Sequence, residues 1–267
     1  MYIRRMGESV PVKRLNIGNG IATFIGDTHG ALDISSYAVM KSVESDLVCF
    51  LGDIVDRGEH QLLNLLFLLE SSIISTKIII IRGNHESPSM NSYYGFKQEL
   101  VRLGLYDILY KEIVELYGVL PYACLVNDRV LGVHGGIPRD CMSLDDWDGL
   151  PMGDEVPSDP CAFEILWNDP SEILAGFEPG VRGEGTYLFG KDAFSSFMKE
   201  NNLDLLVRGH QVKAEGVESM FRNRLVTVFS SKYHGGKAGI LEVEFRPKVV
   251  FTAQTVTGQE TGLPFLQ

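Results

Sequence analysis

Eight short apolar segments recur along the chain, and each one ends in glycine or in a cluster of polar residues. Their richness in Val, Ile, Leu and Phe is typical of buried β-strands. The predicted strands are residues 21–26, 46–52, 77–83, 129–136, 203–209, 224–230, 239–245 and 248–254. Helix-like patterns over 31–44 and 60–72 separate the first three of them.

This alternation of strand and helix predicts βαβ units and a parallel sheet in the first half of the chain. The strands are apolar throughout, which agrees, because parallel strands are usually covered on both faces. Residues 127–128, Asn-Asp, separate two apolar segments and predict a β-hairpin. The last three strands follow one another without helices, so antiparallel pairs are expected there. We therefore expect an α/β (α+β) fold of two packed mixed β-sheets flanked by helices.

Composition limits the class of protein. Of the 267 residues, 45% are hydrophobic and 22% charged, which is ordinary for a soluble globular chain. The net charge of -11 argues against nucleic-acid binding, because phosphate backbones select basic surfaces. The longest apolar segment, 62–69, is too short to span a bilayer and is expected to be a core helix. No nucleic-acid or membrane partner is expected.

The ends of the chain carry little pattern. The N-terminus is basic but lacks the apolar segment of a secretory signal, which favours a cytoplasmic protein. We expect one catalytic domain over residues 1–255 and a weakly patterned C-terminal tail over 256–267.

The four cysteines, Cys49, Cys124, Cys141 and Cys161, are scattered and form no C-x-x-C pair. This spacing argues against a disulfide framework and against a zinc-thiolate site, and it favours a reducing compartment. The cysteines are expected to be small buried apolar side chains.

Polar side chains follow five of the predicted strands at the point where each strand ends. The sequences are GDTHG (26–30), GDIVDRG (52–58), RGNHE (82–86), VHGG (133–136) and RGHQ (208–211). A single Asp or His after a strand is most often a turn residue. The recurrence at five strands, however, favours one shared site, because ligands bind at the carboxyl ends of strands in open α/β sheets.

The residues in these clusters offer only oxygen and imidazole nitrogen as ligand atoms. Such donors suit Mn, Fe or Zn, and six of them without cysteine fit two metal ions that share a carboxylate. Paired metal ions promote in-line displacement at phosphorus. The candidate ligands are Asp27, His29, Asp53, Asn84, His134 and His210.

The motifs GDTHG, GDIVDRG and IRGNHE, in this order, resemble those of the calcineurin-like metallophosphoesterases. Later segments resemble, more specifically, the phosphoprotein phosphatase family of Ser/Thr phosphatases, and the likeness covers roughly residues 20–245. These segments are SPSMNSYYGF (87–96), LWNDP (166–170), RGEGTYLFG (182–190), HQVKAEGVE (210–218) and LVTVFS (225–230).

The resemblance implies a calcineurin-like metallophosphoesterase fold and hydrolysis of phosphoserine and phosphothreonine monoesters in proteins. The reaction would be direct attack by a hydroxide that bridges two divalent metal ions, without a phosphoenzyme. Manganese is the first expectation for these ions, with iron or zinc as alternatives. Phosphorylated proteins would be the substrates, and a regulatory subunit would be a further partner.

The resemblance also implies a role for each site residue. Asp27 and His29 would hold the first metal, and Asn84, His134 and His210 the second, with Asp53 shared by both.

The same resemblance implies the groups that act on the substrate. His85 would be the general acid that protonates the leaving alkoxide, and Asp56 would orient it. Arg57 and Arg182 would grip phosphate oxygens, which Asn84, His85 and Tyr233 would also face. The loop around Tyr233 reads SSKYHGG (230–236), where the family usually has a longer loop that contains proline.

Two other functions remain open at this point. A dinucleoside-polyphosphate (ApaH-like) or other small-molecule phosphoesterase would share the first three motifs. An inactive scaffold that binds phosphoproteins is a third possibility, although it would not need the pair of His85 and Asp56.

Two features of the sequence also have alternative interpretations. The acidic segment 140–159 is either solvated surface or a rim that attracts basic peptides. His234 either is structural or lines the mouth of the site, whereas His60 is expected to be structural.

Overall fold

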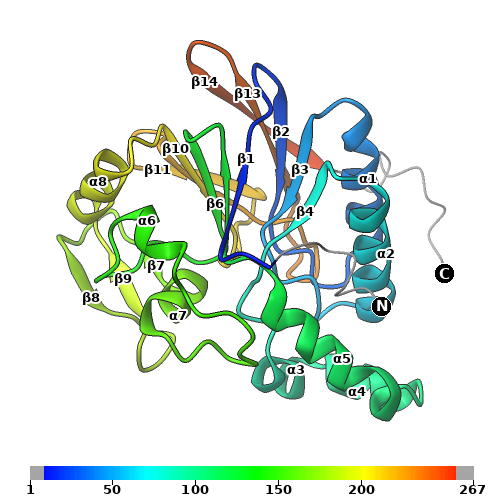
Figure 1. The fold of residues 1–267 in the computed structure, drawn as a ribbon. Helices are drawn as coiled ribbons and strands as arrows, with labels where there is room; N and C mark the ends of the chain where they lie inside the picture. The colour runs from blue at the N-terminus through cyan, green and yellow to red at the C-terminus, as the bar shows by residue number, and fades with distance from the viewer. Residues whose placement is uncertain (1–8, 257–267) are drawn as a thin grey trace.

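Two large β-sheets pack face to face, and helices cover the outer face of each (Figure 1). The structure, a computed structural model, describes residues 9–256. This arrangement confirms the predicted fold of two packed mixed sheets flanked by helices. The predicted tail, apart from Val256, lies outside the described residues.

The five-stranded sheet contains the βαβ units predicted for the first half of the chain. Its strands, in spatial order, are β14 (Val249–Val256), β13 (Ala238–Phe245), β2 (Ile21–Ile25), β3 (Leu47–Phe50) and β4 (Ile78–Ile80). β2, β3 and β4 are parallel, and β13 pairs antiparallel with both β2 and β14. The connections are α1 (Leu32–Met40) with the 3₁₀ turn η2 (Lys41–Val43), and α2 (Gln61–Ile74).

The six-stranded sheet combines parallel and antiparallel pairs. Its order is β1 (Val12–Leu15), β5 (Ala123–Val126), β6 (Val130–Val133), β10 (Leu205–Arg208), β12 (Leu225–Val228) and β11 (Val217–Met220). The predicted hairpin joins β5 to β6, and Asn127 and Asp128 in its turn both have positive φ, 52° and 55°. Of the last three predicted strands, β13 and β14 pair antiparallel as expected, but β12 lies in the other sheet and pairs with β11 and β10. β10 lies parallel to both β6 and β12.

A third, small sheet and six further helices complete the described chain. The sheet has the order β7 (Asp169–Pro170), β9 (Tyr187–Phe189) and β8 (Phe177–Pro179). The helices are α3 (Pro88–Tyr94), α4 (Phe96–Arg102), α5 (Tyr106–Val119), α6 (Leu144–Trp147), α7 (Pro160–Trp167) and α8 (Lys191–Glu200). Strands of two or three residues are too short to show a period in the sequence, which is why the small sheet was not predicted.

Alternation along the strands distributes side chains to separate cores. Leu47 and Cys49 of β3 pack between the two sheets, whereas Val48 and Phe50 face the side covered by α2. α2 buries four of its leucines in that outer core, as its apolar pattern predicted. In the described part of the chain, no helix combines the length and the apolar character needed to cross a membrane.

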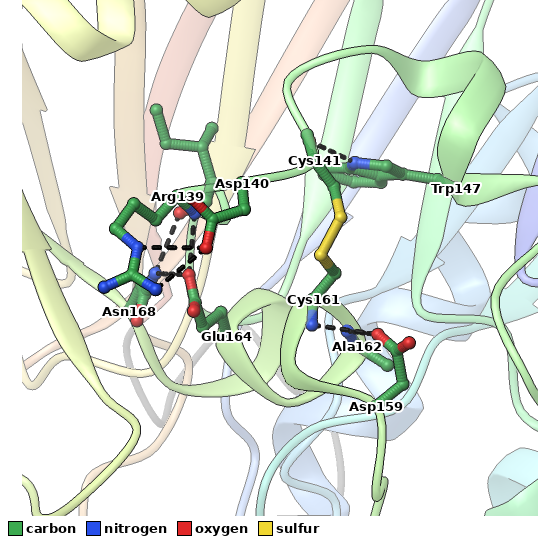
Figure 2. The surroundings of a disulfide bond; sticks show 10 residues. Arg139, Asp140, Cys141, Trp147, Asp159, Cys161, Ala162, Glu164 and Asn168 are labelled. Atoms are coloured by element: carbon green, nitrogen blue, oxygen red, sulfur yellow. Dashed lines mark hydrogen bonds and ion pairs between the residues drawn. A yellow bond between two sulfur atoms is a disulfide. The ribbon is translucent and has the colours of Figure 1, made fainter.

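The structure contradicts one expectation about the cysteines. Cys49 and Cys124 are buried and free, as predicted, but Cys141 and Cys161 form a disulfide with their Cα atoms 6.1 Å apart (Figure 2). The chain between them contains α6, and the pairing depends on how this segment folds, so it leaves no local sequence signal. The cysteine pattern therefore no longer supports a reducing compartment.

The disulfide holds the first turn of α7, the helix that ends at Trp167. The Asp159 side chain caps this helix by accepting hydrogen bonds from the N–H groups of Cys161 (2.9 Å) and Ala162 (3.1 Å). The Trp147 indole N–H donates to the Cys141 carbonyl at 2.9 Å (Figure 2). The acidic segment is thus anchored at both of its ends.

We predict that removal of this disulfide destabilises the protein. The double variant Cys141→Ser/Cys161→Ser should lose about 3 kcal/mol of unfolding free energy, because the unfolded chain regains the entropy of an open loop of this length. Denaturant titration with and without reductant measures the effect. The variant should not respond to reductant, whereas the parent protein should; equal stability of the parent in both conditions would contradict the prediction.

Candidate active site

The predicted site residues converge on one cavity of about 260 Å³. Nine of the eleven line it, and the other two, His134 and Asp56, form hydrogen bonds to lining residues. Side chains that follow β2, β3, β4, β6 and β10 thus meet in one place, together with Arg182 and Tyr233 from other loops. The roles that the sequence suggested for them remain proposals, but their proximity is a structural fact.

Both sheets present the carboxyl ends of their parallel strands to this cavity, and backbone contacts fasten the sheets together there. The His134 ring, after β6, lies with Nδ1 2.7 Å from the carbonyl oxygen of Leu51, after β3. The backbone N–H of His210, after β10, donates to Asp27 Oδ1 at 2.8 Å, and Ser230 N–H donates to the Asp27 carbonyl at 3.1 Å. The site is therefore built across the seam between the sheets.

The backbone around the site is held in an uncommon conformation. Among the described residues, eleven other than glycine have positive φ, and five of them are predicted site residues. These five are His29 (46°), Asp53 (53°), Asp56 (70°), Arg57 (67°) and His210 (69°). Non-glycine residues adopt this region only when the surroundings impose it, and such strain is concentrated at functional sites.

Asp53 lies at the centre of the cluster and faces imidazoles on two sides. Its Oδ2 lies 3.7 Å from His29 Nε2 and 3.8 Å from His85 Nε2. Its Oδ1 lies 3.3 Å from His134 Nε2. The carboxylate is 2% exposed, so its charge is compensated by these neighbours and not by water. Its two oxygens thus point to two separate groups of donors, as a shared ligand requires.

The ring orientations favour ligand nitrogens that point inward. His29 Nδ1 lies 2.8 Å from the Val55 carbonyl, and His134 Nδ1 is held by Leu51 in the same way. A ring whose Nδ1–H donates to a carbonyl presents the lone pair of Nε2, and carbonyl partners of this kind accompany metal-binding histidines.

The electrostatics of the cluster favour a bound cation. Burial and the neighbouring Asp53 raise the pKa of Asp27 to about 6, and burial together with His85 lowers the pKa of His29 to about 3. Burial opposes ionisation of Asp53, yet His134, His85 and His29 outweigh it and hold the Asp53 pKa well below its ordinary value. For His134, burial is likewise outweighed by Asp53, and its pKa rises to about 9. The two buried carboxyl groups, Asp27 and Asp53, thus favour positive charge beside them.

The donors present fit metal ions. Among the described residues, two groups have ligand atoms within 4.8 Å of one another: His29, Asp53 and His85, and Asp53, His134 and His210. Asn84 Oδ1 lies 2.8 Å from His134 Nε2, which lies 3.1 Å from His210 Nδ1, so three ligand atoms converge. His210 Nε2 is buried without a hydrogen-bond partner in the described structure. Oxygen and imidazole donors of this kind suit Mn, Fe or Zn.

His85 differs from the other histidines in its partner. Its Nδ1 lies 2.7 Å from Asp56 Oδ2, a carboxylate, whereas the rings of His29 and His134 rest on carbonyls. Burial opposes a charge on His85, but Asp53 and Asp56 outweigh it and raise its pKa. This environment favours a protonated imidazole, which is what a general acid requires.

Cationic side chains border the same cavity. The Arg57 guanidinium lies 4.0 Å from the centroid of the Tyr94 ring and 5.3 Å from that of Tyr233. Arg182 donates from Nε to Asp169 Oδ2 at 2.5 Å and from Nη2 to the His210 carbonyl at 3.3 Å. Tyr233 also lies against His29, with ring centroids 5.3 Å apart. The shorter loop therefore still brings Tyr233 to the site.

Two positioning residues were missed by the sequence interpretation. Buried Asp169 accepts from Arg208 Nη2 at 2.9 Å as well as from Arg182, so it couples the two guanidinium groups. Glu86 accepts hydrogen bonds from the backbone N–H groups of Asp53, Ile54 and Gly83, all at 2.8–2.9 Å, and so joins the ends of β3 and β4. Asp169 lies in the motif LWNDP and Glu86 in the motif RGNHE, and these motifs are the sequence signal that could have identified them.

Other candidates lie outside the lining of the cavity. In the part of the chain that is described, the lining includes neither His60 nor His234, nor a residue from 140–159. His234 instead packs against Phe229, with ring centroids 4.8 Å apart. The acidic segment is attached to the site through Arg82, whose guanidinium donates to the carbonyls of Asp154 (2.9 Å) and Glu155 (2.6 Å). Steering of basic peptides by this segment stays a prediction.

Comparison with known proteins places this site in a family context. Residues 22–214 match the family model described as calcineurin-like phosphoesterase. The chain is 33% identical over 229 residues to the serine/threonine-protein phosphatase 4 catalytic subunit of Kluyveromyces lactis, covering 83% of this chain and 74% of that protein. The protein of the same name from Saccharomyces cerevisiae shows the same identity and coverage.

A solved structure is similar as well. It is a protein serine/threonine phosphatase from Saccharomyces cerevisiae with similarity to human phosphatase PP5, with a TM-score of 0.84 and 25% identity. The match covers 96% of this chain and 87% of that one.

We predict that Asp53→Asn removes bound metal, because the neutral amide cannot balance two cations and leaves the imidazoles without their carboxylate. Elemental analysis after purification in excess manganese should find at least about tenfold less metal per chain than in the parent. Asp33→Asn, which neutralises a partly exposed carboxylate beside Lys232, is the matched control and should keep its metal. Full metal content in Asp53→Asn would refute the central role of this carboxylate.

Proposed function

The chain belongs to the phosphoprotein phosphatase family of the calcineurin-like phosphoesterases, and we propose that it hydrolyses phosphoserine and phosphothreonine monoesters in proteins. The observation that carries the proposal is the pair of His85 and Asp56 beside the cluster around Asp53. A proton donor, a cation-binding centre and two arginines that face one cavity are the groups needed to cleave a phosphate ester.

Metal binding is part of this proposal. Asp27 and His29 would hold one ion, Asn84, His134 and His210 the other, and Asp53 both. When bound, a pair of divalent cations supplies an activated water and neutralises charge on the phosphate. We propose manganese as the first candidate, with iron or zinc as alternatives.

The arginines would bind and orient the phosphate. Arg57 reaches the cavity from the segment after β3 and Arg182 from the loop between β8 and β9 of the small sheet. Each is braced before substrate arrives, Arg57 by Tyr94 and Arg182 by Asp169. A guanidinium offers two parallel N–H groups to two phosphate oxygens, which fixes the direction in which the ester bond points. Bracing lowers the entropy lost when substrate is bound.

His85 would supply the proton for the leaving group. As the bond between phosphorus and the serine oxygen breaks, that oxygen gains negative charge and takes a proton from His85 Nε2. Asp56 holds Nδ1–H, so that Nε2 faces the cavity and the positive charge on the ring is favoured before transfer. An alkoxide is a poor leaving group, so this proton should matter most for alkyl phosphates.

The substrate class and the cellular setting follow as further parts of the proposal. Phosphorylated proteins would be the partners, with a regulatory subunit as a second partner and the cytoplasm as the location. A panel of phosphoserine and phosphothreonine peptides assayed beside diadenosine tetraphosphate, with manganese-loaded protein, tests the substrate class. Preference for diadenosine tetraphosphate would replace the proposal by a small-molecule phosphoesterase, and no release of phosphate from any ester would favour a scaffold.

We predict that His85→Asn lowers turnover of a phosphoserine peptide by about 10²- to 10⁴-fold, the usual contribution of a general acid. Turnover of p-nitrophenyl phosphate should fall less, because its leaving group departs without a proton. Steady-state kinetics on both substrates measures the difference, with metal content checked by elemental analysis. His60→Asn, which changes a histidine outside the cavity, should leave both rates unchanged. Unaltered peptide turnover in His85→Asn would remove His85 from the mechanism.

A further inference from the structure

Behind the acid pair lies a chain of buried hydrogen bonds that reaches α5. Asn91, on the buried side of α3, donates from Nδ2 to Asp56 Oδ2 at 3.2 Å and to the His85 carbonyl at 2.9 Å. The Tyr117 hydroxyl donates to Asn91 Oδ1 at 3.1 Å. Asn91 and Tyr117 are both fully buried, so water does not substitute for these partners.

Two partners that can only accept decide which way the Asn91 amide points. An Asn amide can turn over and exchange its oxygen and nitrogen, and only the hydrogen-bond partners select one orientation. The His85 carbonyl and the Asp56 carboxylate can only accept, so Nδ2 faces them and Oδ1 faces the Tyr117 hydroxyl. Tyr117 therefore donates to Oδ1, and the Tyr110 hydroxyl, 3.5 Å away, is a second and longer donor to the same oxygen.

The carboxylate of Asp56 is thereby fixed from three directions. Oδ2 accepts from His85 Nδ1 and from Asn91 Nδ2, and Oδ1 accepts from the backbone N–H of Phe96 at 3.1 Å. Phe96 begins α4 and follows Gly95, the left-handed C-cap of α3. Because both oxygens are held, the Asp56 carboxylate has one orientation. That orientation fixes the direction of the His85 ring.

We propose that Asn91 and Tyr117 are positioning residues for proton transfer: Tyr117 holds the Asn91 amide oxygen in place, and the amide nitrogen holds Asp56 and the His85 backbone so that Nε2 of His85 faces the leaving group. This inference rests on the proposed function of His85 as the general acid. Neither residue contacts the cavity, so both act only through the acid pair.

The test compares substrates that do and do not need the proton. In Asn91→Leu, kcat/KM for a phosphoserine peptide should fall about tenfold relative to kcat/KM for p-nitrophenyl phosphate, as for loss of a partner that orients a functional group. Tyr117→Phe removes only the hydroxyl, and the same ratio should fall about threefold because the amide oxygen loses the shorter of its two hydrogen bonds and is held less firmly. Metal content, from elemental analysis, should equal that of the parent protein.

Tyr122→Phe is the matched control. It removes the hydroxyl of another buried tyrosine, which donates to the Pro151 carbonyl at 2.9 Å, and it should leave the substrate ratio unchanged. If Asn91→Leu fails to fold, the smaller change in Tyr117→Phe decides the question.

A second readout is independent of turnover. The proton shared by His85 Nδ1 and Asp56 Oδ2, 2.7 Å apart, should give a downfield resonance in the ¹H NMR spectrum. We expect this resonance to shift in Asn91→Leu and in Tyr117→Phe, but not in Tyr122→Phe. Equal losses on both substrates with an unshifted resonance would overturn the proposal. Absence of phosphatase activity in the parent protein, with the resonance still responding, would instead refute the proposed function and keep the positioning role.

Discussion

The rest of the site depends on one interaction, the attraction between the buried Asp53 carboxylate and the imidazoles around it. A carboxylate removed from water must be compensated by positive charge nearby. Here the compensation comes from two imidazoles whose pKa is raised, His85 after β4 and His134 after β6. The same requirement explains why the site draws in cations, and why both sheets are joined at this point.

The left-handed backbone at Asp53 and its neighbours follows from the need to compensate this buried charge. Asp53, Asp56 and Arg57 all have positive φ, so the segment after β3 turns repeatedly instead of leaving the sheet in an extended form. Glu86 compensates by accepting hydrogen bonds from the N–H groups of Asp53 and Ile54. The strained backbone after β3 is thus stabilised by Glu86, which lies in the motif after β4. The two motifs therefore depend on each other structurally.

Sequence patterns predicted the strand ends because their signal is local. A buried apolar segment followed by Asp-x-His or Asn-His can be identified from a single chain, and each such segment led to the cavity. The disulfide of Cys141 with Cys161 and the small sheet could not be predicted, since they depend on how residues 139–190 fold back on themselves. Asn91 lies in the motif SPSMNSYYGF, but its role appears only when Tyr117 is seen beside it.

The central claim is that Asp53 lies between two bound divalent cations. Anomalous diffraction from crystals grown with manganese tests it directly, because the scattering locates each ion without assumption about activity. The account predicts two peaks, one between Asp53 and the His29 side of the cavity and one between Asp53, His134 and His210. Peaks elsewhere, or none beside Asp53 at saturating manganese, would contradict it.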